Sequence, residues 1–156
     1  MRQTLRSRRS LVSDVVVDSS IVVAWALPDE TLHSRALGIV DQLTSGALEP
    51  VVALPFTFEV RHALVRAARA GRLDWATIPS WIAAIDALEP THVEPRPDET
   101  GILDLAERLG LTWGDAHWVD VAGRLDLPLL TADRRLTRAV PDDVAIVVYV
   151  GDAGAP

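Results

Sequence analysis

Short apolar runs rich in β-branched residues alternate along the chain with longer helical patterns. The short runs are residues 14–17, 50–53, 91–93, 128–131 and 145–149. Helical patterns cover about 20–27, 30–45, 55–70, 74–87, 98–109 and 114–125, with a short one at 134–139. The short runs are nearly continuous in apolar residues, which is typical of strands covered on both faces. Strands alternating with helices predict βαβ units and an α/β fold, with a parallel sheet between layers of helices.

The length and composition favour one ordered domain. The chain has 156 residues, of which 49 % are hydrophobic and 24 % charged. No apolar run approaches the ~20 residues of a membrane span. The basic start resembles the first part of a signal peptide, but Asp14 and Asp18 interrupt any apolar segment behind it, so we do not expect one here. We expect a flexible basic tail at 1–12, a single domain at 13–150, a C-terminal tail at 151–156, and a cytoplasmic protein without membrane association.

The charged residues narrow the possible chemistry. The chain contains no cysteine, which excludes thiol catalysis, disulfides and Cys-based zinc sites. All 15 basic residues are arginine, and the formal net charge of −7 disfavours non-specific attraction to nucleic acid. A polyanionic substrate would therefore need a local arginine patch, a metal site, or both.

Four acidic residues interrupt apolar segments. Asp18 follows the first strand, and Asp133 closely follows the fourth. Glu59 falls on the apolar stripe of helix 55–70, formed by Phe56, Val60, Ala63, Leu64 and Ala67. Asp115 begins the apolar face of helix 114–125, formed by Trp118, Val119, Ala122 and Leu125.

Each acid also has an ordinary structural interpretation. The three aspartates occupy positions suited to helix caps or turns, although Ser19 and Ser20 compete with Asp18 for the first cap. Glu59 would instead form a buried pair with an arginine or reach water from the edge of its stripe.

Two neighbours of Asp115 lie off the apolar face of the same helix. We expect His117 at the surface, and we expect Asp120 there as an ion-pair partner of Arg124, four residues later.

A parallel sheet would bring the four acids to one edge. Asp18 and Asp133 follow strands at their carboxyl ends, and the helices that carry Glu59 and Asp115 begin at that edge. If the first and fourth strands are neighbours, this edge is the point where strand order reverses, where ligands bind in open α/β sheets. Close carboxylates repel one another unless cations neutralise them. Oxygen ligands without cysteine suit Mg²⁺ or Mn²⁺.

Three segments resemble the PIN-domain ribonucleases, and in particular the VapC-type toxins of bacterial toxin–antitoxin pairs. They are V-V-V-D-S-S-I-V-V-A-W, P-F-T-F-E-V-R-H-A-L and L-T-W-G-D-A-H-W-V-D-V-A-G-R-L-D-L-P-L-L-T-A-D-R-R-L, spanning residues 15 to about 136. The acids of the family carry over onto Asp18, Glu59, Asp115 and Asp133, with Thr131 and Ser19 in support. His62 stands where many members have asparagine, which we take as neutral for activity.

The resemblance implies a three-layer α/β/α fold with a five-stranded parallel sheet in order 3-2-1-4-5. It also implies Mg²⁺- or Mn²⁺-dependent cleavage of RNA, with a transfer RNA or ribosomal RNA loop as the target. Asp18, Asp115 and Asp133 would be metal ligands, and Glu59 would ligate the metal or orient the attacking water. Arginines near the edge would bind phosphate, and the candidates are Arg61, Arg134 and Arg135.

The resemblance further implies a VapB-like antitoxin partner, with a homodimer, or a heterotetramer or larger assembly with the antitoxin. Helices 30–45 and 74–87 are amphipathic and are candidate docking surfaces, although we favour the intramolecular core for Trp75 and Trp81.

The absence of lysine argues against several other functions that also place aspartates at strand ends. Receiver and haloacid-dehalogenase-like domains and P-loop NTPases require a lysine, which the chain lacks. A catalytically inactive PIN domain that acts as an RNA-binding or scaffold module remains the alternative.

Overall fold

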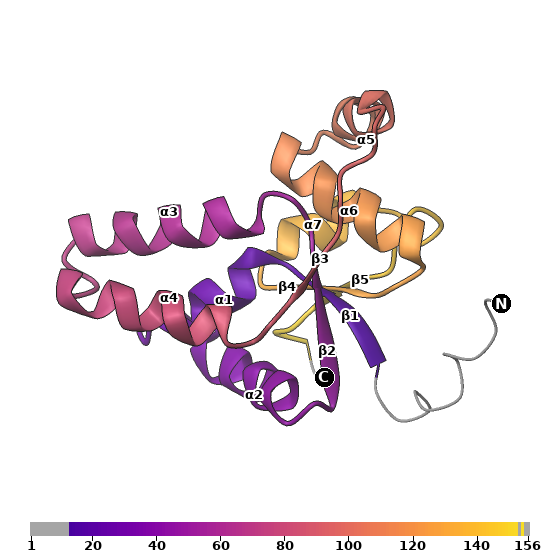
Figure 1. Ribbon diagram of the computed structural model, residues 1–156. Helices are drawn as coiled ribbons and strands as arrows, with labels where there is room; N and C mark the ends of the chain where they lie inside the picture. The colour runs from indigo at the N-terminus through magenta and orange to yellow at the C-terminus, as the bar shows by residue number, and fades with distance from the viewer. Residues whose placement is uncertain (1–12, 153, 155–156) are drawn as a thin grey trace, which may run out of the picture.

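The computed structural model describes residues 13–152 and 154, and a five-stranded parallel sheet lies at its centre (Figure 1). The strands are β1 (Ser13–Val17), β2 (Leu48–Val52), β3 (Thr91–His92), β4 (Leu129–Thr131) and β5 (Val147–Tyr149). Their order is β3-β2-β1-β4-β5 with every pairing parallel, which confirms the predicted order. The predicted flexible tail, residues 1–12, lies outside the described residues, as do residues 153, 155 and 156.

Seven α-helices and one short 3-10 helix are found in the described part of the chain. The helices are α1 (Ser19–Ala26), α2 (His33–Thr44), α3 (Phe56–Arg69), η1 (Trp75–Thr77), α4 (Ile78–Asp86), α5 (Thr100–Leu109), α6 (Trp113–Leu125) and α7 (Arg134–Ala139). In Figure 1, α1 to α4 lie to the left of the strands, and α5 and α6 lie above them. Within residues 13–152 and 154, no helix has both the length and the apolar character needed to cross a bilayer.

The central strand β1 sends alternate side chains into two hydrophobic clusters. Val16 belongs to a cluster that includes side chains of α3 and α6. Val15 and Val17 belong to a second cluster with side chains of α1 and α2. This alternation follows from the period of two in a strand, and it explains why an almost uninterrupted apolar run forms β1. The sheet is therefore the middle layer of a three-layer α/β/α fold.

Strand order reverses between β1 and β4, and this places several helix starts at one edge of the sheet. The chain leaves β1 into α1 and leaves β4 into α7, while β2 is followed by α3. The carboxyl ends of these strands and the first turns of the helices converge near the centre of Figure 1. The expected site therefore lies at the edge where open α/β sheets bind ligands.

Helix α6 is buried more extensively than its sequence pattern predicts. The predictions of a surface His117 and a surface Asp120 are wrong, because these residues are only 3 % and 4 % exposed. Asp120 does pair with Arg124, but Arg96 from the loop before α5 binds it as well. The loop and α5 thus cover a face of α6 that the periodicity assigned to solvent. Leu125, predicted to be buried, is 42 % exposed because it stands in the last turn of α6.

The predicted helix 74–87 is divided into the single turn η1 and the helix α4. Trp81 on α4 packs edge-on against Trp25, with their ring centroids 5.2 Å apart, and is partly buried. Trp75 lies in η1, where no residue is buried, and is 53 % exposed. The favoured placement of Trp75 in the core is therefore wrong, since a single surface turn offers no apolar surface to cover it.

Candidate active site

Asp18 follows β1 directly and is held by hydroxyl groups. Thr131 donates a hydrogen bond of 2.6 Å to its Oδ2, and Ser20 donates one of 2.7 Å to the same atom. The backbone N–H of Ser20 donates to Oδ1 at 3.3 Å, which makes Asp18 itself the N-cap of α1. Of the three residues considered for this cap, Asp18 holds it, because Ser19 and Ser20 both lie within the helix.

Burial gives Asp18 unusual electrostatics. The residue is 6 % exposed, and loss of solvation raises the pKa of its carboxyl. Hydrogen bonds from Thr131 and Ser20 act in the opposite direction, and the negative charge of Glu59 adds to the rise in this pKa. The groups that bind Asp18 are uncharged, so they leave the carboxylate without a neutralising partner. A nearby cation would stabilise it.

Glu59 is joined to Asp18 through Ser19. The Ser19 hydroxyl lies 2.6 Å from Glu59 Oε2 and 3.2 Å from Asp18 Oδ1, so it is within donating reach of both carboxylates. The indole Nε1 of Trp118 on α6 also donates to Glu59 Oε2, at 3.3 Å. These contacts hold Glu59 between α1 and α6, and its partners are Ser19 and Trp118 in place of the arginine considered as one alternative.

Gly114 leaves room for this glutamate. A Cβ atom at position 114 would lie 2.5 Å from Glu59 Oε1, closer than any non-bonded contact allows. The first turn of α6 can therefore approach Glu59 only because residue 114 has no side chain.

Asp133 follows β4 and caps α7. Its Oδ1 accepts the backbone N–H of Arg135 at 2.8 Å. The Arg135 side chain also donates hydrogen bonds to both carboxylate oxygens. Its Nη2 lies 2.6 Å from Oδ2, and its Nε lies 3.1 Å from Oδ1 and 3.1 Å from Oδ2. This guanidinium lowers the pKa of Asp133. The backbone N–H of Asp133 donates to Thr131 Oγ1 at 3.0 Å, which links Asp133 to the hydroxyl that holds Asp18.

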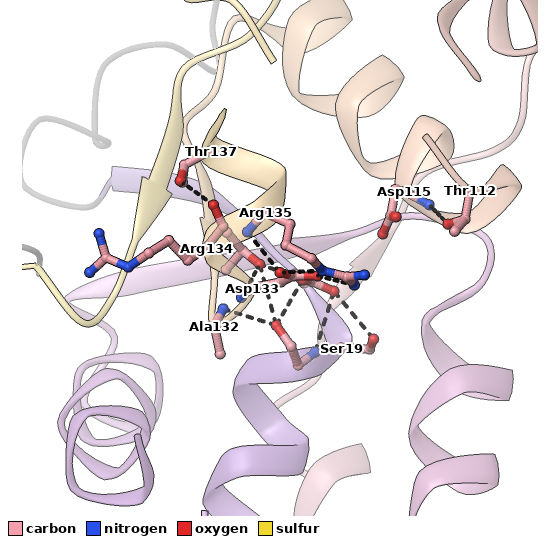
Figure 2. A network of polar contacts seen from close by, with 11 residues as sticks. Ser19, Thr112, Asp115, Ala132, Asp133, Arg134, Arg135 and Thr137 are labelled. Atoms are coloured by element: carbon pink, nitrogen blue, oxygen red, sulfur yellow. Dashed lines mark hydrogen bonds and ion pairs between the residues drawn. The ribbon is translucent and has the colours of Figure 1, made fainter. Parts of the chain in front are cut away.

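Asp115 lies across a small cavity from Asp133. The N-cap of α6 is Thr112, whose hydroxyl accepts the backbone N–H of Asp115 at 3.1 Å, so the Asp115 carboxylate is not used as the cap. Asp115, Asp133 and Arg135 all line the same cavity of about 180 Å³. Figure 2 shows Arg135 reaching over Asp133 toward Asp115, and both acids raise the pKa of this guanidinium, Asp133 more strongly.

The acids therefore gather at one edge as two linked groups. Ser19 joins Asp18 to Glu59, and Arg135 stands beside Asp133 and Asp115. Among the described residues, no three His, Cys, Asp or Glu side chains are close enough to form a ready metal site. Such a spacing agrees with the mutual repulsion of carboxylates that no cation neutralises. The positive charge beside the second group comes from Arg135.

The three candidate phosphate-binding arginines have different surroundings. Arg61 forms two contacts of 3.1 Å with Asp86 on α4. Arg134 lies over the ring of Tyr149, 4.1 Å from its centroid, and Nη2 is 2.8 Å from Asp152. Of the three, Arg135 makes the direct contacts with a candidate catalytic acid.

Two contributors to the site were not predicted in their observed roles. Ser20 was considered only as a cap, yet its hydroxyl bonds Asp18 and accepts the backbone N–H of Ala132 at 3.0 Å. Trp118 was assigned only to the buried face, yet its indole bonds Glu59. In the sequence, the second serine of D-S-S and the tryptophan three residues after Asp115 are the features that could have indicated these two roles.

Comparisons with known proteins agree with this geometry. The family model described as PIN domain matches residues 15–140. Exonuclease VapC9 of Pyrobaculum aerophilum is 35 % identical over 79 residues, which are 51 % of this chain. The match spans only 58 % of that relative's length. The crystal structure of PAE2754 from Pyrobaculum aerophilum has a TM-score of 0.62 and 25 % identity, covering 87 % of this chain and 91 % of that one.

Proposed function

The chain belongs to the PIN domain family, and from this we propose that it is a divalent-metal-dependent ribonuclease that acts as the toxin of a VapBC-type toxin–antitoxin pair. One observation carries the proposal. A buried Asp18, held by hydroxyls and without a described cationic partner, lies at the strand-reversal edge where Glu59, Asp115 and Asp133 also gather.

The residues at this edge fit Mg²⁺ or Mn²⁺. All candidate ligands are carboxylate oxygens, which hard cations prefer, and burial disfavours the anionic form of Asp18 unless a cation is present. Asp18, Asp115 and Asp133 would hold the metal. When bound, it would polarise the scissile phosphate and lower the pKa of a water molecule.

Glu59 would ligate the metal or orient the attacking water. Ser19 and Trp118 both bind its Oε2, which fixes the carboxylate and leaves Oε1 for another group. A positioned carboxylate can accept a proton from water during attack on phosphorus.

Arg135 would bind substrate phosphate. In the free protein its guanidinium neutralises Asp133. A metal bound to Asp133 would compete for the same oxygens and release the guanidinium, whose planar fork suits a phosphate. Arg61 and Arg134 would contribute positive charge farther from the acids.

Exonuclease action is a second candidate, since the relative from Pyrobaculum aerophilum is named an exonuclease. We favour internal cleavage of a structured RNA loop, as expected from the resemblance to VapC-type toxins. A circularised RNA separates the two activities because it has no ends. An endonuclease will linearise it, and an exonuclease will leave it intact.

The decisive assay incubates purified protein with total cellular RNA and with circularised RNA, in Mg²⁺ or Mn²⁺ and in EDTA. Asp115→Asn tests the site, and Asp104→Asn is the matched control because Asp104 is an exposed acid on the neighbouring helix α5. We expect cleavage that requires metal, is lost in the first variant and is retained in the second. Cleavage in EDTA, or by Asp115→Asn, would contradict the mechanism. Binding of RNA without cleavage would favour the scaffold function.

We propose a small VapB-like antitoxin as the partner, in the cytoplasm, with a homodimer or heterotetramer as the assembly. An apolar groove of about 570 Å³ along α3, with exposed Leu54 and Phe58, supports a docking role for this face. Co-expression with the product of the adjacent upstream gene tests this proposal. We expect one complex on size-exclusion chromatography and relief of growth inhibition. Separate elution and unrelieved toxicity would contradict the pairing.

A further inference from the structure

A cavity of about 410 Å³ adjoins the acidic edge on the side of α1. Its walls include Ser20 and Val23 of α1, Glu30 and Thr31 of the following loop, Ala132 after β4, and Tyr149 of β5. The volume lies within the range of pockets that bind small molecules.

One side chain connects this cavity to the acids. Ser20 lines the cavity, and its hydroxyl donates to Asp18 Oδ2 at 2.7 Å. The Ser20 hydroxyl oxygen accepts the backbone N–H of Ala132, which also lines the cavity and precedes Asp133. An occupant of the cavity would therefore lie beside the group that we assign to metal and scissile phosphate.

The chemistry of the walls suits a neutral flat ring better than a phosphate. The lining contains the acid Glu30 and no arginine, so a phosphate would be repelled. Val23 and the Tyr149 ring provide apolar surface, while the Thr31 hydroxyl and the Glu30 carboxylate offer hydrogen-bonding groups. Arg72, which lies outside the cavity lining, binds Glu30 Oε1 at 2.6 Å and so restricts the movement of this carboxylate.

Positive charge lies next to the cavity. Arg134 packs over the ring of Tyr149 and directly follows Asp133 in the chain. A pocket without a cationic lining residue, flanked by an arginine that in the free protein pairs with Asp152, matches a nucleotide, whose base is neutral and whose phosphate is an anion. Single-stranded RNA is commonly read by inserting an unstacked base into such a protein pocket.

We propose that this cavity binds one nucleobase of the RNA substrate, adjacent to the cleaved phosphodiester, and gives cleavage a base preference at that position. The proposal rests on the ribonuclease function proposed above. The Glu30 carboxylate accepts hydrogen bonds only, so the favoured base presents N–H donors to it.

Val23→Phe is designed to fill the cavity while leaving the four acids and their hydrogen bonds unchanged. Val65→Phe is the matched control, because Val65 is a partly buried valine on α3 that lines a different groove. The substrate is a random-sequence RNA pool, and the sequences at the cleaved ends report base preference. Wild type and Val65→Phe should prefer one base at a fixed position, and Val23→Phe should lose the preference and raise KM by about tenfold. An unchanged preference in Val23→Phe, or no preference in wild type, would overturn the proposal.

A binding measurement keeps the base pocket testable without catalysis. Nucleoside monophosphates are titrated into wild type and into Val23→Phe in EDTA, with ribose 5-phosphate as the probe that lacks a base. We expect amide NMR shifts at Thr31 and Ala132 in wild type with at least one nucleotide, and none with ribose 5-phosphate. Equal shifts with ribose 5-phosphate, or no shifts at all, would overturn the base pocket. Absence of RNA cleavage alongside nucleotide-specific shifts would contradict only the nuclease function.

Discussion

Asp18→Asn is expected to stabilise the metal-free protein at neutral pH and to abolish its stabilisation by Mn²⁺. The amide keeps the shape of the carboxyl, and its oxygen can accept the Ser20 N–H. The Thr131 and Ser20 hydroxyls can rotate to accept hydrogen bonds from the new NH₂ group. The substitution therefore removes the buried charge while preserving the local hydrogen bonds.

The expected rise in the stability of Asp18→Asn follows from two opposing contributions to the free energy of the buried carboxylate. Moving an ion out of water costs several kcal/mol, and each hydrogen bond to it returns about 1.5–3 kcal/mol. The two short hydroxyl bonds and the longer amide bond to Asp18 offset much of the cost, and we take the remaining penalty on the anion as on the order of 1–2 kcal/mol, the usual size of a single-substitution effect. For a domain of this size, 1 kcal/mol shifts Tm by about 2–4 °C, so Asn should raise Tm by about 2–8 °C.

The stability gained by Asp18→Asn over wild type should increase as pH rises. Because the folded pKa of Asp18 is raised above its usual value of 3.8, the folded state holds the proton where the unfolded state has lost it. The free energy of unfolding of the wild type therefore falls as pH rises from 3.8 through the folded pKa. The difference between Asp18→Asn and wild type should be small near pH 3.8 and largest at neutral pH.

The assay is thermal unfolding of wild type, Asp18→Asn and the control Asp104→Asn, in EDTA and in saturating Mn²⁺. A ligand at about 100 times its Kd stabilises the folded state by about 2.7 kcal/mol, so wild type and the control should show a clear rise in Tm. The EDTA series is run near pH 3.8 and at neutral pH, and a loss of Tm for Asp18→Asn that is equal at the two pH values would refute the buried-charge reasoning. An undiminished response of this variant to Mn²⁺ would refute its place in the metal site.

Three further substitutions test separate parts of the site. Arg135→Gln should increase Mn²⁺ affinity about two- to fivefold by calorimetric titration, because the guanidinium competes for Asp133; unchanged affinity would show that it does not compete. Gly114→Ala should displace Glu59 and lower kcat on RNA by about tenfold or more, whereas Gly38→Ala, which meets nothing within 4 Å, should leave kcat unchanged. Equal kcat in both glycine variants would contradict the role of that close approach. Asp120→Ala should lower the free energy of unfolding by about 1.5–3 kcal/mol in denaturant titrations, since it removes a buried carboxylate that holds Arg96 and Arg124 against α6; a change as small as that of Asp104→Ala would contradict this.

The strands of the sheet could be predicted because each strand is marked by a short run of neighbouring residues in the sequence. The valines of β1 are buried on both faces, and such a strand shows an unbroken apolar run in the sequence. The positions of Asp18 and Asp133 follow from the ends of their strands, since parallel strands share one carboxyl edge. The resemblance to VapC-type PIN domains supplied the strand order, which the structure confirms.

The remaining features depend on contacts between distant segments. Burial of His117 and Asp120 requires α5 and the Arg96 loop to cover α6, and helical periodicity describes only one face of one helix. The pairing of Arg135 with Asp133 is a choice among several nearby acids that spacing does not determine. Asp120 shows most clearly that the contacts of a buried acid depend on distant segments. Its Oδ1 accepts no well-aligned hydrogen bond, although Arg96 Nε lies 2.6 Å away.

The chemical ends of the cleaved RNA give the most direct test of metal-dependent hydrolysis at the acidic edge. Attack by water on phosphorus, with the ribose 3′ oxygen as the leaving group, leaves a 5′-phosphate and a 3′-hydroxyl. We predict these ends for wild type in Mg²⁺ or Mn²⁺, and no new ends in EDTA or with Asp18→Asn. A 2′,3′-cyclic phosphate with a 5′-hydroxyl would mean attack by the ribose 2′ oxygen. That result would contradict water activation by the carboxylates of this site.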